Sequence, residues 1–219
     1  MSQDLLHEDL NTKKSLPITP VIASGLIAFA NWQGNSKVVS TLTDVRPDSS
    51  WVEWLYRWPG SFFKASPYMG KVGDTALSVG LIAATMAHTE RDEGIKRTLK
   101  IAAFGHALGC AATRTAAVVG LVPSEQMHAL DVGSSSATAA LVGNWVTRFF
   151  RGRDERFSTR QARAIAMGIG AIGIAALGVL DPSVTDTVGH VVPYAYGMWE
   201  GGRKPLPTQQ PLVTAEAFT

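Results

Sequence analysis

Two polar residues within otherwise apolar sequence have the side chains of a nucleophile and its base. Ser135 lies in residues 131–136, with the sequence Asp-Val-Gly-Ser-Ser-Ser, and His190 follows a glycine. A histidine within hydrogen-bond reach of a serine can take the hydroxyl proton during attack on a carbonyl and return it to a leaving amine. The pair is therefore a candidate nucleophile–base dyad.

The two residues fall at similar distances from the start of an apolar stretch. Ser135 lies about six residues into the stretch 129–150, and His190 about six residues into the stretch 184–201. At 1.5 Å per helical residue, both would sit roughly 9 Å below the same surface, on parallel helices. The alternative is structural, because serines in membrane helices commonly bond a carbonyl one turn back and a histidine can bridge two helices.

Six apolar stretches, rich in Gly and Ala, separate the charged parts of this 219-residue chain. Each has about 17 to 22 residues, the length of a helix that crosses a bilayer. A soluble helix would normally carry charges every third or fourth residue on its exposed face, and these stretches mostly do not. They predict an all-α, polytopic membrane protein with six transmembrane helices. The stretches are residues 16–32, 72–88, 101–122, 129–150, 164–180 and 184–201.

Basic residues between the stretches predict the orientation. Lys and Arg collect before the first stretch, in the loops 89–100 and 148–163, and after the last stretch, whereas the turns 123–128 and 181–183 carry none. Positively charged loops stay in the cytoplasm, so we expect both termini there. The predicted organisation is a cytoplasmic tail (1–15), a membrane domain (16–201) with an aromatic extracytoplasmic loop (33–71), and a second cytoplasmic tail (202–219).

Two segments leave alternatives open. The first stretch is expected to be a retained helix, but Ala28-Phe29-Ala30 resembles the cleavage site of a signal peptide. The loop 33–71 is rich in Trp, Tyr and Phe, which favour the membrane interface and predict an amphipathic segment lying at the surface. An ordinary extramembrane loop with a small aromatic core is the alternative.

Composition argues against several other classes. The net charge of +2 is too small to indicate a nucleic-acid partner, and the single cysteine, Cys110, excludes an internal disulfide framework and a zinc cluster. The five histidines show no metal-ligand spacing such as His-Glu-x-x-His, so we predict neither metal nor cofactor. His106 is expected to make a packing hydrogen bond too far from Ser135 to share its chemistry.

Short motifs follow one another between about residues 66 and 201. They are Ala-Ser-Pro at 65–67, Glu-Arg-Asp-Glu-Gly at 90–94, Gly-His at 105–106, Asp-Val-Gly-Ser-Ser at 131–135, and Gly-His at 189–190 with Gly197. Their order resembles the rhomboid family of intramembrane serine proteases, most of all the divergent rhomboid-like proteins of actinobacteria. The resemblance implies a rhomboid-like bundle in the bacterial plasma membrane, with Ser135 as nucleophile and His190 as base. The implied substrates are transmembrane segments of other membrane proteins.

The chain departs from the family pattern at several positions. Ser136 stands where active rhomboids have a glycine after the nucleophile, and Ala139 replaces an aromatic residue that would stack on the histidine. Pro193 stands where a glycine is usual in the sixth helix. These departures favour the alternative function of a catalytically inactive rhomboid-like protein that binds transmembrane helices of its partners. A scaffold or small transporter subunit unrelated to rhomboids is a third possibility.

The oxyanion of an acyl-transfer reaction needs hydrogen-bond donors. Aligned with the family, Asp74 and Ser78 occupy the His-x-x-x-Asn positions that help to hold it. Because a carboxylate would repel the developing charge, backbone N–H groups near Ser135 and the guanidinium of Arg114 are the other candidates. Arg114 could instead form an ion pair with Asp74 or Asp131 that ties the helices together.

Overall fold

The computed structural model describes residues 17–33, 36–47, 49–64, 71–127, 134–152, 157–180 and 183–203. These residues form α-helices and one short 3-10 helix without any β-strand, which confirms the all-α prediction. Each of the six predicted stretches coincides with a helix. The helices are α2 (Ile18–Trp32), α3 (Lys37–Thr43), α4 (Trp51–Ser61), α5 (Lys71–Glu93), α6 (Ile95–Val118), η1 (Ser124–Gln126), α7 (Ser135–Arg151), α8 (Thr159–Leu180) and α9 (Val184–Arg203).

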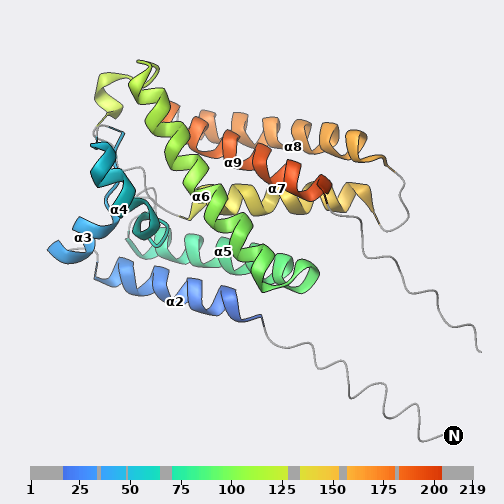
Figure 1. Cartoon of the computed structure of the whole chain (residues 1–219), viewed down its shortest axis with the longest axis horizontal. Helices are drawn as coiled ribbons and strands as arrows, with labels where there is room; N and C mark the ends of the chain where they lie inside the picture. Colours follow the sequence, from blue (N-terminus) through green and yellow to red (C-terminus); the bar gives the residue numbers. More distant parts are fainter. Residues whose placement is uncertain are drawn as a thin grey trace, which may run out of the picture.

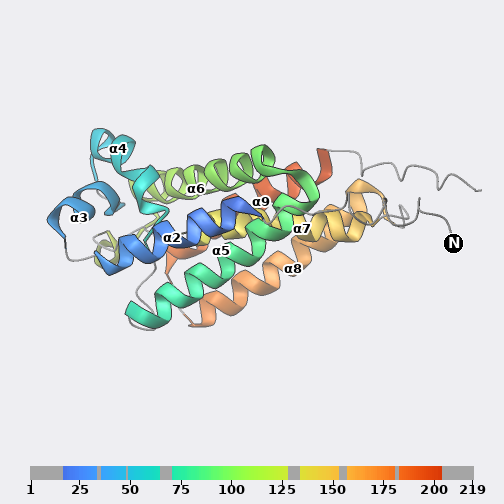
Figure 2. The ribbon, with the colours of Figure 1, turned by 90° about the horizontal axis from the view of Figure 1, so that it is seen from below.

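The six long helices alternate in direction, so that the start of α2 and the end of α9 lie at the same end of the bundle (Figure 1). We call this the basic end, because Arg97, Lys100, Arg148 and Arg203 gather there. Helix α5 turns into α6 at this end through Gly94, whose φ of 82° suits glycine. The short helices α3 and α4 lie together at the opposite end, which we call the aromatic end (Figure 2).

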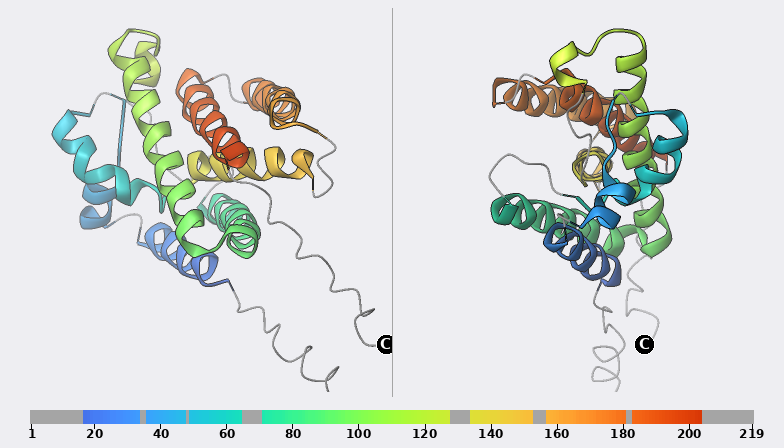
Figure 3. Two further views of the ribbon diagram at one scale, coloured as in Figure 1. Left: turned by 45° about the vertical axis from the view of Figure 1, so that its right-hand side comes forward. Right: turned by 90° about the vertical axis from the view of Figure 1, so that its left-hand side faces the viewer.

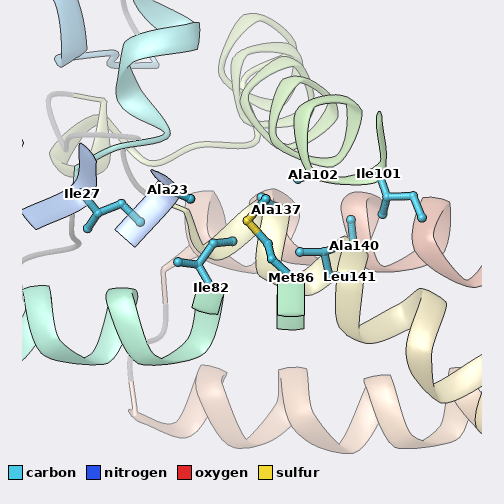
Figure 4. Packing of buried hydrophobic residues seen from close by; sticks show 9 residues of the cluster. All are labelled: Ala23, Ile27, Ile82, Met86, Ile101, Ala102, Ala137, Ala140 and Leu141. Carbon is cyan, nitrogen blue, oxygen red and sulfur yellow. The ribbon is translucent and has the colours of Figure 1, made fainter. Parts of the chain in front are cut away.

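Helix α7 occupies the centre of the bundle. It packs against α5, α6, α8 and α9, while α2 packs against α5. Figure 3 shows α7 between the pair α2 and α5 on one side and the pair α8 and α9 on the other. The main apolar core joins α2, α5, α6 and α7 (Figure 4). Its buried members are Ala23, Ile27, Ile82, Met86, Ile101, Ala102, Ala137, Ala140 and Leu141.

At the basic end, two buried carboxylates join the ends of four helices. The Glu93 side chain at the end of α5 is 1% exposed and pairs with Arg97 of α6 and with Arg148 of α7, the latter at 3.2 Å. Arg97 also pairs at 3.1 Å with Glu200 of α9, whose side chain is 1% exposed too. Lys100 and Arg203 complete the set around Glu200. Because buried charges are costly unless paired, this network fixes the four helix ends relative to one another.

Many large apolar side chains point away from the bundle. They lie on all the long helices and on both helices of the aromatic end. In the described part of the chain, no helix has both the length and the apolar character needed to span a membrane. The most exposed of these side chains, all above half exposure, include Val21, Phe29, Trp32, Val72, Phe104, Phe149, Met167 and Ile172.

Helices α7 and α9 approach so closely that backbone meets backbone. A Cβ placed on Gly197 would overlap the carbonyl oxygen of Ala140, and one on Gly143 would overlap that of Tyr194. Small residues allow this approach, which is typical of helix pairs that pack by van der Waals contact in lipid. A different glycine, Gly168 on α8, has nothing within 4 Å of the corresponding position.

This contrast gives a matched pair of variants. We expect Gly197→Ala to destabilise the protein by about 1–3 kcal/mol or more, because the new methyl group meets backbone that cannot move aside. Gly168→Ala should be neutral, or stabilising by up to about 1 kcal/mol, since alanine is the better helix former. Thermal unfolding of the purified variants measures both. Equal melting temperatures for the two variants would contradict the close contact between α7 and α9.

Candidate functional site

Helices α7 and α9 run parallel, as expected, and a serine joins them near the start of α7. The buried Ser136 hydroxyl donates a hydrogen bond of 2.8 Å to the carbonyl oxygen of Gly189 in α9. Gly109 of α6 lies against the same hydroxyl, because a Cβ there would overlap it. Three helices therefore meet around the Ser136 side chain.

Pro193 explains why the carbonyl of Gly189 is available to Ser136. A proline inside a helix has no N–H to donate to the carbonyl four residues earlier. Pro193 lies inside α9, and the residue four positions before it is Gly189. The Ser136 hydroxyl supplies the donor that the helix lacks. Two of the departures from the rhomboid pattern, Ser136 and Pro193, thus compensate each other.

His190 is half-buried on α9 and has a defined tautomer. Its Nδ1 lies 2.5 Å from the carbonyl oxygen of Asp186, one turn earlier in the helix. Because a carbonyl oxygen can only accept, Nδ1 carries the proton in this hydrogen bond. In the neutral ring, Nε2 then carries the lone pair, so Nε2 is the atom that can accept a proton from a nucleophile.

Ser135 is the first residue of α7, which corrects the prediction that it lies about six residues into a helix. Glycine and clustered serines favour helix ends over helix interiors, so α7 begins several residues after the start of the predicted stretch 129–150. Asp131 and the other residues of 128–133 lie outside the described residues. At a helix start the first N–H groups have no intrahelical acceptor and the dipole is positive. The half-buried Ser135 hydroxyl thus lies beside backbone donors that suit an oxyanion.

The structure brings Ser135 and His190 near one another without joining them. Each is one residue from the hydrogen-bonded pair Ser136 and Gly189. Successive residues of an α-helix point about 100° apart, so neither side chain points along the contact itself. Among the described contacts, no hydrogen bond connects Ser135 with His190. The Ser–His dyad therefore stays a prediction: the two residues flank one contact between α7 and α9, and no described hydrogen bond joins them.

Arg114 makes two contacts that the sequence did not indicate, while Asp131, one of its expected partners, lies outside the described residues. Its Nη1 donates to the carbonyl of Pro47, and its guanidinium lies 5.4 Å from the centre of the Trp51 ring. It therefore holds the start of α4 against α6, and no described contact pairs it with Asp74. Asp74 is buried near the start of α5, and Ser78 lies half-buried one turn further along the same helix. No described contact connects Arg114, Asp74 or Ser78 with Ser135.

His106 joins the middle of α6 to the aromatic end. Its Nε2 lies 2.8 Å from the carbonyl oxygen of Trp58 and 2.9 Å from the hydroxyl of Ser61, both in α4. The imidazole is fully buried, and Cys110 lies beside it, with its sulfur 3.8 Å from Nε2. His106 thus fixes the position of α4 and makes no described contact with Ser135. Nothing in the sequence pointed to Ser61 as its partner.

A comparison of the chain with models of known protein families, with curated proteins and with solved structures finds no match to any of them. Among the described residues, no three His, Cys, Asp or Glu side chains gather as a possible metal site. Function is therefore inferred from the geometry around Ser135, Ser136 and His190.

The compensation between Ser136 and Pro193 can be measured in a double-mutant cycle. Ser136→Ala should destabilise the protein by about 1–3 kcal/mol, because the buried carbonyl of Gly189 loses its donor. In a Pro193→Ala background, the restored N–H can satisfy that carbonyl, and the same serine substitution should cost less. Denaturant unfolding of the four proteins gives the coupling free energy. Strict additivity would show that the two residues act separately.

Proposed function

We propose that this protein is a rhomboid-like serine protease of the bacterial plasma membrane that cleaves transmembrane segments of other membrane proteins. The observation that carries the proposal is the hydrogen bond from Ser136 to Gly189, which holds the residues next to Ser135 and His190 in contact. The order of the motifs along the chain supports the same family.

The distribution of apolar and charged side chains supports a membrane location. Helices α5, α6, α8 and α9 have 20 to 24 residues, or about 30–36 Å at 1.5 Å per residue. A bilayer hydrocarbon core is about 30 Å thick. Each of these helices carries three or four exposed large apolar side chains, while many of the buried residues are small or bear a hydroxyl group. Arginine and lysine side chains concentrate at the basic end, which we place in the cytoplasm together with both termini.

The chemistry proceeds in two transfers of the acyl group. The Ser135 oxygen attacks the carbonyl carbon of the scissile bond while Nε2 of His190 takes the hydroxyl proton. The N–H groups at the start of α7 stabilise the oxyanion, a task for which the carboxylate of Asp74 is unsuited. His190 returns the proton to the leaving amine. A water molecule, deprotonated by the same imidazole, then attacks the acyl carbon, and the imidazolium gives that proton to the departing Ser135 oxygen, which releases the carboxylic acid product. Side-chain rotation must first bring Ser135 to within about 2.6–3.2 Å of Nε2.

One observation favours a second function. Because no described hydrogen bond joins Ser135 to His190, the protein could bind transmembrane helices of its partners without cleaving them. The apolar outer faces of the helices suit that role equally well. The two functions differ only in whether Ser135 becomes nucleophilic.

Reactivity of Ser135 with a fluorophosphonate probe decides between the two functions. We expect labelling of Ser135, identified by mass spectrometry, and complete loss of labelling in Ser135→Ala. His190→Gln should slow labelling by about 10²–10⁴-fold, because it removes the general base. Ser124→Ala, which removes an exposed hydroxyl of η1 that makes no described contact with α7, is the matched control and should still be labelled.

Unlabelled protein that is folded, as judged by its melting temperature, would refute the protease proposal. If such protein still bound a transmembrane peptide, and did so equally well as Ser135→Ala, the helix-binding function would replace it.

A further inference from the structure

A polar hollow lies between α3 and α4 at the aromatic end. Its volume is about 380 Å³, and it is separate from Ser135 and His190. Unlike the apolar outer surface of the long helices, its lining is made of hydroxyl, carboxylate and guanidinium groups. The lining residues are Ser40, Thr41, Asp44, Arg46, Ser49, Glu53 and Arg57.

Among the described residues that line this hollow, Arg46 is the charged side chain without an ion pair. The carboxylate of Glu53 pairs with Arg57 at 3.2 Å, and that of Asp44 pairs with Lys64 beside the hollow. Hydrogen bonds from the backbone N–H and the hydroxyl of Ser50 also hold the pKa of Glu53 below its usual value, so it stays ionised and paired. The exposed guanidinium of Arg46 makes no ion pair with any described residue. The hollow therefore has one positive charge to offer to a ligand.

Exposed apolar side chains lie on the two helices, α3 and α4, that border the hollow. Helix α4 faces α6 with Trp58 and Ser61, which His106 holds in place. Outside these contacts and the contact between α3 and α4, both helices carry exposed side chains. An amphipathic helix of this kind lies in the membrane interface, with aromatic rings at the depth of the lipid headgroups. The exposed apolar side chains of the two helices are Val38, Leu42, Trp51, Val52, Leu55 and Tyr56.

We propose that this hollow binds the phosphodiester headgroup of an anionic phospholipid of the outer leaflet, with Arg46 as the phosphate ligand. The proposal rests on the membrane location that we infer under the proposed function. A guanidinium donates two parallel hydrogen bonds to phosphate oxygens, and the exposed apolar side chains of α3 and α4 suit the acyl chains. Because both carboxylates among the described lining residues are already paired, neither is free for a choline cation, so an anionic headgroup is preferred over phosphatidylcholine.

Native mass spectrometry of the detergent-solubilised protein tests this site. The probe is dioctanoyl phosphatidylglycerol, with dioctanoyl phosphatidylcholine as the neutral comparison. We expect Arg46→Gln to weaken phosphatidylglycerol binding by about tenfold, the effect of losing one charge-assisted contact. Arg160→Gln is the matched control. It removes an exposed arginine at the start of α8, at the basic end, which likewise makes no described ion pair, and it should leave the affinity of this site unchanged.

Three results would overturn the proposal. The first is an unchanged affinity in Arg46→Gln, and the second is an equal loss in Arg160→Gln. The third is binding of glycerophosphoglycerol or inorganic phosphate as tightly as the lipid, which would make the hollow a site for a free anion. The measurement is made on the Ser135→Ala protein, so it needs no catalysis. Failure of the probe reaction at Ser135 would leave a lipid result standing, and failure of lipid binding would leave labelling of Ser135 intact.

Discussion

Where α7 and α9 cross, Gly197 has no side chain, and the backbone of α9 reaches the carbonyl of Ala140. Any larger residue there would separate the two helices. The hydrogen bond from Ser136 to Gly189, which is 2.8 Å long, would then be stretched or lost, because hydrogen bonds weaken as the distance between donor and acceptor grows. The relative position of the candidate nucleophile and base therefore depends on a backbone contact further along the same helix pair.

The basic end complements this contact with a different kind of interaction. Glu93 and Glu200 are buried and share Arg97, so the ends of α5, α6 and α9 are held by one guanidinium. Removing one partner from a buried ion pair leaves an uncompensated charge and typically costs about 3–5 kcal/mol. The aromatic end is held more lightly, by hydrogen bonds from Arg114 and His106 to backbone carbonyls of the segment 47–58. Ion pairs thus fix the helices at the basic end, whereas hydrogen bonds to uncharged backbone carbonyls join α4 and the residues before it to α6 at the aromatic end.

The positions of the long helices could be predicted from the sequence, but the contacts between them could not. Length and apolar character identified all six long helices, because these properties are local. The start of α7 at Ser135 was not predicted, because the length of an apolar stretch does not show at which of several clustered serines a helix begins. The contact of Arg114 with a backbone carbonyl 67 residues away was not predicted, because no side-chain type reveals such an acceptor. Likewise, the basic clusters were interpreted as orientation signals, and their pairing with buried Glu200 could not be inferred.

Ser136 and Pro193 show how departures from a family pattern should be weighed. Taken singly, a serine in place of the glycine after the nucleophile and a proline within the last helix each argue for lost function. In the structure the proline removes a helical donor from Gly189, and the serine replaces it. Coupled substitutions of this kind preserve local geometry that either one alone would disturb. The two departures are therefore not independent arguments against catalysis, and the contact that they form leaves Ser135 itself free of the packing role that Ser136 has taken.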